Sequence, residues 1–391
     1  MKKTLVALAA VSAVSAFAQV TIDGYMDRGY RALSNSDSTK NLKTVGSNAG
    51  TTTFGIKYYE DIGGGMTVGG QVNTDWADIG GASQTSGIAL AQTSGFANSQ
   101  SFVKFSSATA GTLQMGTPNN YTLTNATAIA SPEFSTGVGS TYSDQFSIAN
   151  GIGTGTSGYG GTAIAQAGIT SIANAGARAI RIANTYQYVS PSFNGVTFAY
   201  GTTLQNNNAT ATSGAGNTVG VTEYMLRYSN GPIDAAYTSI KYDVGANGTN
   251  QLKLVTTAGG AVGVTAYNAM TVQDNTQNLL GVKYTTPVAG LVLNAGFGNF
   301  TSSTGTYSGS SKTYGGTYTK GALDFLAIFA KVDDTSSTNI DRTMTGLGVN
   351  YNLSKTSRVY YRYDSINFGS NVTAASGSTQ KRTAFGISKS F

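Results

Sequence analysis

A repeating hairpin pattern constrains the fold of this chain more than any other feature. In the segment 53–59, Phe54, Ile56 and Tyr58 alternate with other residues, a Gly-rich turn follows at 60–65, and 66–72 resumes the alternation. Alternation with a period of two on both sides of such a turn indicates two antiparallel strands. Seven further hairpins are predicted on the same grounds: 99–106 with 111–117, 182–189 with 195–203, 222–229 with 233–242, 250–257 with 261–270, 278–285 with 290–298, 312–319 with 322–331, and 343–352 with 357–364.

The connections between these strands are of two kinds. Turns inside the hairpins are short, whereas the segments between hairpins are long and rich in Ser, Thr, Asn and Gly. Short turns at one end and long loops at the other are typical of outer-membrane β-barrels. With a first strand at 20–31 and a last strand at 382–391, the count favours eighteen strands. An even number lets the first and last strands pair, and hydrocarbon tolerates no free sheet edge.

The composition supports a membrane barrel over a soluble protein. Only 11% of the residues are charged, whereas soluble domains carry about 25%. Beyond residue 18 no stretch reaches the ~18 consecutive apolar residues of a membrane-spanning helix. A barrel resolves this conflict, because lipid-facing and lumen-facing residues alternate along each strand and cancel in any window average. The predicted fold class is therefore all-β, a transmembrane antiparallel β-barrel.

The first eighteen residues have the pattern of a cleavable signal peptide. Lys2 and Lys3 precede an apolar stretch at 4–17, and Ala16-Phe17-Ala18 supplies the small residues of a cleavage site. We therefore expect two parts: a signal peptide at 1–18 and a single barrel at 19–391, in the outer membrane of a Gram-negative bacterium.

The composition also argues against several functions. The chain has no His and no Cys, so the commonest general base and all thiolate chemistry are missing, and we expect no enzyme, cofactor or metal site. The formal charge is +6, and removing Lys2 and Lys3 leaves +4, with Lys and Arg scattered along the chain. The sequence has no basic patch, so it does not predict nucleic-acid binding.

Several strings resemble the general trimeric porins of β-proteobacteria, and together they cover nearly the whole of 19–391. They are 20–27, 54–65, 186–195, 228–232 and 351–355. The C-terminal strand, which places Phe385, Ile387 and the terminal Phe391 on one face, resembles the signal read by the barrel-assembly machinery. The resemblance implies a homotrimer in contact with outer-membrane lipid and lipopolysaccharide.

The resemblance also bears on the strand count and on the pore. Such porins usually have sixteen strands, so one hairpin is in surplus, and we assign it to 312–331. Either the barrel is wider, or one hairpin is an external loop folded back as a ribbon. In the family the third external loop, after the fifth strand, folds into the lumen. Here that region is 118–180, and its partial motif at 131–137 makes Glu133, and less strongly Asp144, acidic constriction candidates. A solvated loop carboxylate is the alternative for Glu133.

Strand phase predicts which basic residues face the lumen. Lys57 and Lys104 alternate with apolar neighbours, and a charge facing lipid at mid-depth costs roughly 2–4 kcal/mol. With Arg31 on the first strand, they are the basic constriction candidates, because in the resembled family they lie near the infolded loop. The other lumen-facing candidates are Asp27, Arg181, Arg227, Lys253, Lys283, Arg358 and Arg362.

The function predicted from these features is passive diffusion of small hydrophilic solutes and ions. A mildly basic lumen favours anions, because the field in a narrow pore discriminates by sign. The alternative is a channel of the same type that is specific for a sugar or a carboxylic acid. Tyr360 is the main candidate for an inward aromatic track of that kind.

Overall fold

Nineteen strands make up most of the part of the chain that a computed structural model describes. The described residues are 19–35, 41–75, 99–134, 136–141, 185–203, 220–243, 252–256, 262–266, 275–302, 308–335, 341–368 and 379–391. The strands are β1 (Gln19–Asn35), β2 (Leu42–Gly46), β3 (Thr53–Gly63), β4 (Met66–Asp75), β5 (Ser101–Ser107), β6 (Gly111–Thr117), β7 (Thr185–Val189), β8 (Val196–Thr203), β9 (Gly220–Asn230), β10 (Ile233–Asp243), β11 (Leu252–Thr256), β12 (Val262–Ala266), β13 (Asn275–Thr285), β14 (Leu291–Ser302), β15 (Ser308–Lys320), β16 (Leu323–Asp334), β17 (Arg342–Asn352), β18 (Ser357–Phe368) and β19 (Thr379–Ser390).

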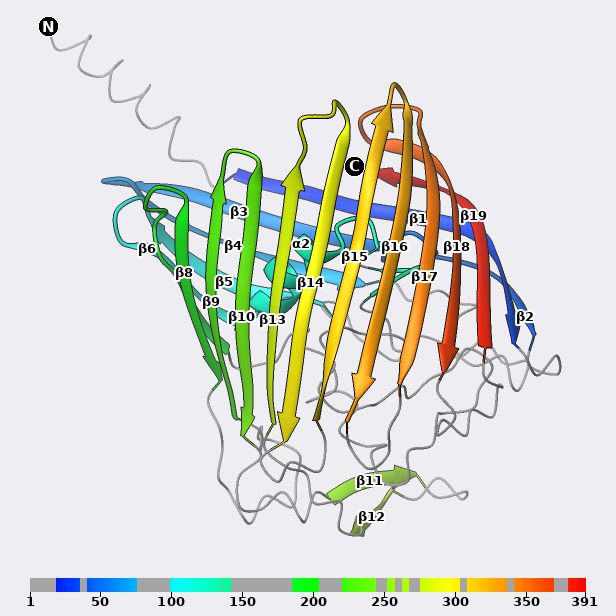
Figure 1. The fold of residues 1–391 in the computed structure, drawn as a ribbon. Coiled ribbons are helices and arrows are strands. Elements are labelled where there is room, and N and C mark those ends of the chain that lie inside the picture. Colours follow the sequence, from blue (N-terminus) through cyan, green and yellow to red (C-terminus); the bar gives the residue numbers. More distant parts are fainter. Residues whose placement is uncertain are drawn as a thin grey trace, which may run out of the picture.

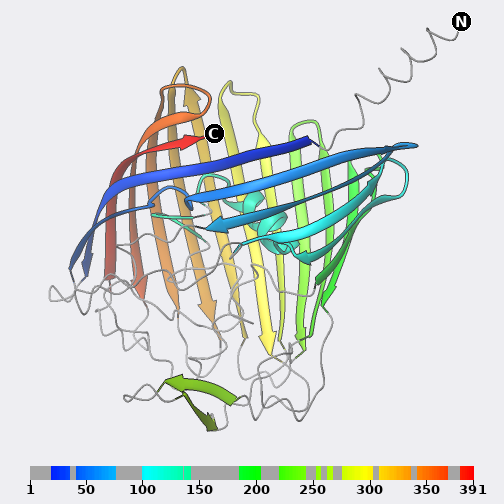
Figure 2. The same ribbon diagram turned by 180° about the vertical axis from the view of Figure 1, so that it is seen from behind.

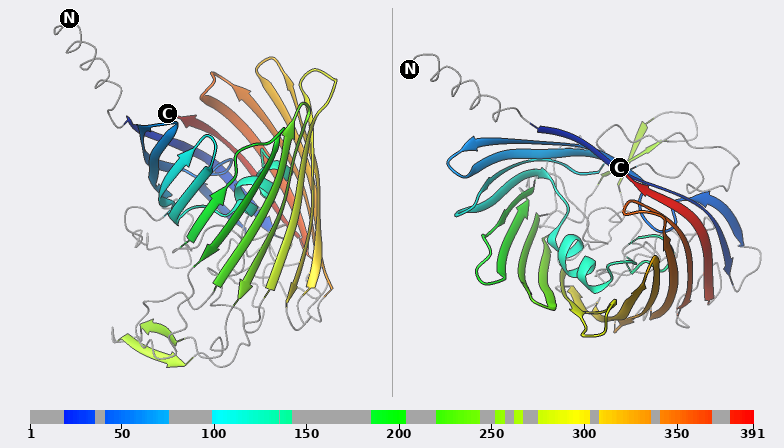
Figure 3. Two further views of the ribbon diagram at one scale, coloured as in Figure 1. Left: turned by 90° about the vertical axis from the view of Figure 1, so that its left-hand side faces the viewer. Right: turned by 90° about the horizontal axis from the view of Figure 1, so that it is seen from above.

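Sixteen strands close into an antiparallel barrel. Each strand from β3 to β10 and from β13 to β19 pairs with its neighbour, β10 pairs with β13, and β1 pairs with both β3 and β19. The ring is visible in Figure 1, from behind in Figure 2 and end-on in Figure 3. The strands are joined in pairs by short turns at one end, as the sequence predicts. Among the described residues, no helix has both the length and the apolar character needed to cross a membrane.

The second barrel position is shared by β2 and β3. β3 pairs with 19–25 of β1, and β2 pairs with 29–33 of the same strand. Between them the segment 47–52 leaves the ladder and folds around Asp27. One carboxylate oxygen of Asp27 accepts the backbone N–H groups of Asn48, Ala49 and Gly50 at 2.7–2.9 Å. The excursion is therefore fixed by a buried carboxylate on the neighbouring strand.

The predicted strand count of eighteen was too high, and the surplus hairpin is not the one at 312–331. β15 and β16 pair with β14 and β17 in the barrel wall. It is the hairpin predicted at 250–270 that lies apart, because among the described residues β11 and β12 pair only with each other in a two-stranded sheet. Figure 1 shows this ribbon off the end of the barrel. Local alternation cannot tell a barrel hairpin from a ribbon, since both alternate with period two.

The barrel has an apolar outer face. Large side chains such as Phe198, Leu226 and Tyr237 are 44–54% exposed and lie in one row across β8, β9 and β10. Directly opposed residues on neighbouring strands point to the same face of the sheet, so all residues of a row lie in the same environment. The prediction of a lipid-facing phase is thus confirmed by the fold.

The seam between the two ends of the chain is closed by backbone and side chains. The terminal Phe391 exchanges two backbone hydrogen bonds with Gly24, at 3.0 and 3.1 Å. A Cβ on Gly24 would lie 2.5 Å from the Phe391 ring and 2.7 Å from the backbone oxygen of Thr53, so this close approach requires glycine. On the inner face the Tyr360 hydroxyl donates to Asp27 across β19, at 2.5 Å. Backbone and side-chain contacts therefore join the C-terminal end of the chain directly to the first strand.

Candidate functional site: the lumen and its infolded loop

Part of the chain between β6 and β7 lies inside the barrel. We call this part, 118–134 and 136–141, the infolded loop; it contains η3 (Thr122–Thr127) and α2 (Ala128–Ala130). Figure 3 shows this segment inside the ring of strands when the barrel is viewed end-on. Since β2 and β3 share one position, β6 is the fifth barrel strand, so the loop leaves from the position that the resemblance implies.

Glu223 on β9 holds the beginning of the loop. Its carboxylate accepts the backbone N–H of Tyr121 at 2.8 Å and the backbone N–H and hydroxyl of Thr122 at 2.6 and 2.7 Å. The Thr122 hydroxyl also contacts that of Thr238 on β10, at 3.1 Å. Burial, and secondarily the Glu223 charge, raises the pKa of Tyr121, whose hydroxyl donates to the backbone oxygen of Tyr188. The loop is thus anchored to the wall as soon as it enters.

The middle of the loop packs on the inner wall through apolar contacts. Ala126, Ala130 and Phe134 belong to one buried cluster with wall residues such as Leu326 and Ile328. At Gly281 on β13 a Cβ would lie 2.1 Å from the backbone oxygen of Ala126, so only glycine allows this contact. Hydrophobic burial therefore holds the loop against β13 to β18 and away from the opposite wall.

The last described residues of the infolded loop, 136–141, are bound near the seam. The backbone N–H of Gly139 donates to Asp364 on β18 at 2.6 Å, and that of Val138 donates to the backbone oxygen of Asn48 at 2.8 Å. Asp364 also forms a buried ion pair with Arg382 on β19. The loop therefore crosses from β9 to the strands on both sides of the seam.

Glu133 lies on the loop where it meets β18. Its carboxylate pairs with Arg358 at 3.2 Å, and the two side chains are 34% and 24% exposed. The next residue, Phe134, lies beneath the guanidinium of Arg362, 5.7 Å from the ring centre. Thus the predicted acidic candidate of the loop contacts one predicted basic candidate of the wall.

The wall formed by β3 to β6 carries the two predicted lysines. Lys57 pairs with Asp23 of β1 at 2.6 Å. Lys104 is exposed, and its row continues through Gln114 to Gln187, which donates to the loop oxygen of Asn119, so this row faces inward. Among the described residues Lys104 has no ion-pair or hydrogen-bond partner, which leaves its charge available to the lumen.

A third charged group lies at the short-turn end of β9, β10 and β13. Asp234 accepts two hydrogen bonds from Arg227, both at 2.9 Å, and pairs with Lys283 at 3.2 Å. Arg227 also donates to Asn125 of the loop at 3.1 Å. Two cations share one carboxylate here, so the group carries a net positive charge.

Several predicted residues lie elsewhere. Asp27, Arg31 and Arg362 are on the inner phase but are buried. Asp144 and Arg181 lie outside the described residues. The prediction that Lys253 faces the lumen was wrong. Lys253 belongs to β11 of the separate ribbon and not to a barrel strand. The error arose because the hairpin that contains Lys253 was counted as part of the barrel wall.

The sequence prediction missed residues that fix the loop. Glu223 shares the phase of Arg227 on β9, and Asp364 shares that of Arg362 on β18, so strand phase could have placed both in the lumen. Asn48 gave no such signal, because its role depends on the excursion at 47–52. Tyr360, the candidate for an aromatic track, is only 4% exposed and donates to Asp27, so its ring is not open to a solute.

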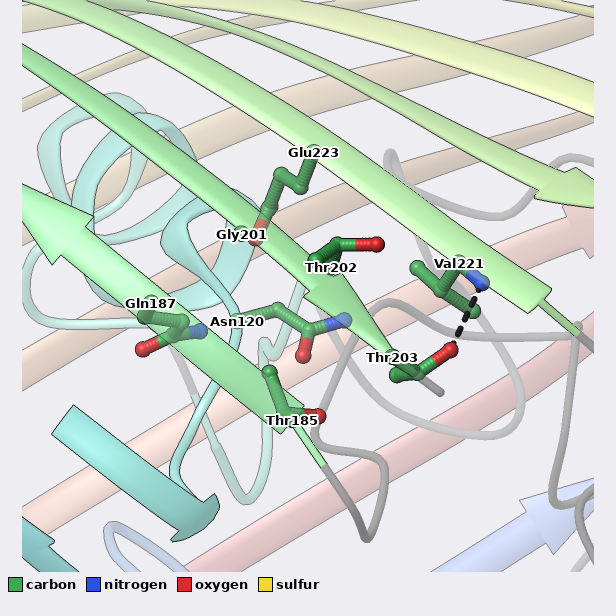
Figure 4. Close-up of a pocket in the computed structure, with 8 residues that line it drawn as sticks. All are labelled: Asn120, Thr185, Gln187, Gly201, Thr202, Thr203, Val221 and Glu223. Carbon is green, nitrogen blue, oxygen red and sulfur yellow. Dashed lines mark hydrogen bonds between the residues drawn. The ribbon is translucent and has the colours of Figure 1, made fainter. Parts of the chain in front are cut away.

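A small pocket lined mainly by residues of polar type lies beside the start of the loop (Figure 4). The Thr203 hydroxyl in it accepts the backbone N–H of Val221 at 2.8 Å. Among the described residues, no group of three or more His, Cys, Asp or Glu could hold a metal ion. The pocket lining is Asn120, Thr185, Gln187, Gly201, Thr202, Thr203, Val221 and Glu223.

A closed barrel with an apolar outside, a charged inside and a loop folded into its lumen defines an outer-membrane β-barrel channel. The chain belongs to the Gram-negative porin family, whose model matches residues 4–371. It is an outer-membrane diffusion channel, as the sequence predicted.

Solved structures show the same fold at low sequence identity. An anion-selective porin from Comamonas acidovorans has a TM-score of 0.67 and 19% identity, with 96% of this chain and 100% of that chain covered. OmpT of Vibrio cholerae has a TM-score of 0.58 and 14% identity, with 96% and 98% covered. Salmonella typhi OmpF in complex with daunomycin has a TM-score of 0.58 and 14% identity, with 95% and 97% covered. No curated protein matches the chain.

Proposed function

We propose that the channel passes small hydrophilic solutes without covalent chemistry and prefers anions. The observation that carries this proposal is an imbalance among the inner charges that solvent reaches, which leaves out the buried carboxylates of Asp27 and Glu223. The carboxylates of Asp23, Glu133 and Asp234 are each paired with a cation, whereas Lys104 is exposed and has no partner among the described residues. In a narrow aqueous pore, uncompensated charge selects ions by sign.

The proposed constriction lies between the infolded loop and the wall of β1 to β6. Glu133 contributes from the loop, and Lys57, Lys104 and Arg31 contribute from the wall; Asp144 is proposed with them from the loop sequence. The paired charges orient a solute, and Lys104 supplies the net positive field. The absence of His and Cys removes the commonest general base and all thiolate chemistry, which supports a channel with no catalytic step.

Reversal potential in a salt gradient across a planar bilayer tests the preference. The expected sign is that of anion permeation in potassium chloride. The Lys104→Gln variant should move the potential toward zero, while Lys320→Gln, an exposed lysine at a short turn, serves as the control. Cation preference of the wild-type channel, or an equal effect of the two variants, would refute the proposal.

We further propose how the protein is processed and assembled. Residues 1–18 act as a cleaved signal peptide, and the strand ending at Phe391 is read by the barrel-assembly machinery. The mature protein forms a homotrimer in contact with outer-membrane lipid and lipopolysaccharide; a trimer form of OmpT of Vibrio cholerae is among the similar structures. Conductance steps that arise in groups of three would support the trimer, and single independent steps would contradict it.

A further inference from the structure

An aromatic ring and a lysine lie side by side on the inner face of β3, β4 and β5, which are adjacent strands of the wall (Figure 1). Tyr59 of β3 lies opposite Gly69 of β4, and Gly69 lies opposite Lys104 of β5. This row faces the lumen, since it continues through Gln114 to Gln187, whose amide donates to the infolded loop. Tyr59 therefore points into the lumen as well.

The neighbouring row adds a second ring and a second cation. Lys57 and Phe102 lie two residues from Tyr59 and Lys104 along their strands, so their side chains point to the same face. The register joins Lys57 to Phe102 through Gln71 of β4. The Lys57 side chain is 50% exposed, and Phe102 is half-buried. We call Lys57, Tyr59, Phe102 and Lys104 the inner aromatic patch.

The Tyr59 side chain is open to the lumen. Tyr59 is 46% exposed, and the infolded loop packs on β13 to β18 through Ala126, Ala130 and Phe134. The loop therefore leaves this side of the lumen accessible. On the outer face an exposed ring meets lipid, whereas the interior of such a barrel is polar and filled with water. An exposed ring on the inner face is thus not explained by contact with the membrane.

The glycine between Tyr59 and Lys104 brings these two side chains together. The position that a Cβ on Gly69 would take lies 3.5 Å from Cε of Lys104 and 3.7 Å from Cα of Tyr59. The Lys104 side chain therefore leans across β4 toward Tyr59. Within the described part of the chain Lys104 forms no ion pair, whereas the other cation of the patch, Lys57, is paired with Asp23. A free ammonium group thus lies beside an accessible aromatic ring.

We propose that the inner aromatic patch binds an aromatic carboxylate, a planar anion of the benzoate type, on its way through the channel. The carboxylate pairs with the ammonium group of Lys104, and the ring of the solute packs against Tyr59. Paired aromatic rings attract each other beyond the area that they bury, so an aliphatic carboxylate binds the patch more weakly. This site rests on the proposed anion channel, for which it names a class of solute.

Block of the chloride current tests the site. Single-channel current of the full-length mature protein is measured in potassium chloride with benzoate, cyclohexanecarboxylate or acetate added over a range of concentrations. We expect benzoate to reduce the current in a saturable way and at a lower concentration than the other two anions. Tyr59→Leu should raise the half-blocking concentration of benzoate roughly 2–10-fold and leave that of acetate unchanged. The matched control is Tyr237→Leu, which removes an equally exposed tyrosine from the outer face.

The wild-type comparison decides the matter even where Tyr59→Leu does not fold. Equal half-blocking concentrations of benzoate and cyclohexanecarboxylate would overturn the proposal, as would a folded Tyr59→Leu channel that benzoate blocks as it blocks wild type. Reversal potential in potassium chloride alone tests the anion preference separately. A channel that prefers anions but does not distinguish benzoate would refute only the site. A channel that prefers cations, yet shows a benzoate block dependent on Tyr59, would refute only the preference.

Discussion

Replacing Glu223 by alanine should loosen the infolded loop at its beginning. In the folded protein this carboxylate accepts three hydrogen bonds, from the backbone N–H groups of Tyr121 and Thr122 and from the Thr122 hydroxyl. The substitution removes all three acceptor contacts at once and leaves the donors inside the lumen. The apolar contacts of Ala126, Ala130 and Phe134 further along the loop stay in place.

The magnitude follows from the number and type of these bonds. A hydrogen bond to a charged group contributes roughly 1.5–3 kcal/mol, so the docked state of the first turn loses on the order of 5 kcal/mol. At about 1.4 kcal/mol per tenfold change, the ratio of docked to undocked loop falls by roughly 4,000-fold. The barrel itself should still fold, because the ladder around β9 is made by backbone groups.

Single-channel recording at fixed voltage measures the effect. We expect more open-channel noise and a broader distribution of conductance for Glu223→Ala than for wild type. The matched control is Glu60→Ala, which removes an exposed carboxylate near a short turn and should leave the recording unchanged. Circular dichroism establishes that the variant barrel is folded. A folded Glu223→Ala channel with wild-type noise and conductance would refute the anchoring role.

Other predictions concern the charges, the seam and the ribbon. Glu133→Gln should increase anion permeability, because Arg358 loses its counter-charge; reversal potential measures this, and no shift would count against a role for Glu133 in the constriction. Gly386→Leu should lower the refolding yield, since a Cβ at Gly386 would lie 2.4 Å from the Tyr360 hydroxyl and overpacking costs roughly 1–3 kcal/mol or more; a normal yield would mean that the seam tolerates displacement of Tyr360. Replacing 252–266 by a short Gly-Ser linker should leave conductance unchanged, because β11 and β12 are not barrel strands; a failure to fold would restore the eighteen-strand count.

The fold could be predicted to a large extent because its signals are local. Alternation such as that of Phe54, Ile56 and Tyr58 identifies a strand and its outer phase without knowledge of any partner. Membership in the barrel is different, since it depends on which strands pair over long range. The hairpin at 250–270 alternates as well as the one at 312–331, yet only the latter pairs with neighbours in the wall.

The candidate site could be predicted only in its components. Strand phase points Arg358 inward, and the loop motif singles out Glu133, but their contact depends on the path of the loop across the lumen. That path is set by Glu223 and Asp364, whose inward orientation can be predicted from the alternation along their strands. It also depends on Asn48, whose position follows from an interruption of the second barrel strand. Contacts between a loop and a distant wall leave no periodic trace in the sequence.

The central claim is that the infolded loop lies against the inner wall, and a disulfide tests it most directly. The hydroxyls of Thr122 and Thr238 are 3.1 Å apart, the chain has no native Cys, and cysteine is close to threonine in size. In the Thr122→Cys, Thr238→Cys double variant we expect the two thiols to join quantitatively under mild oxidation, and mass spectrometry of a digest should find the cross-linked peptides. Two thiols that remain free and separately alkylated in the folded channel would contradict the account.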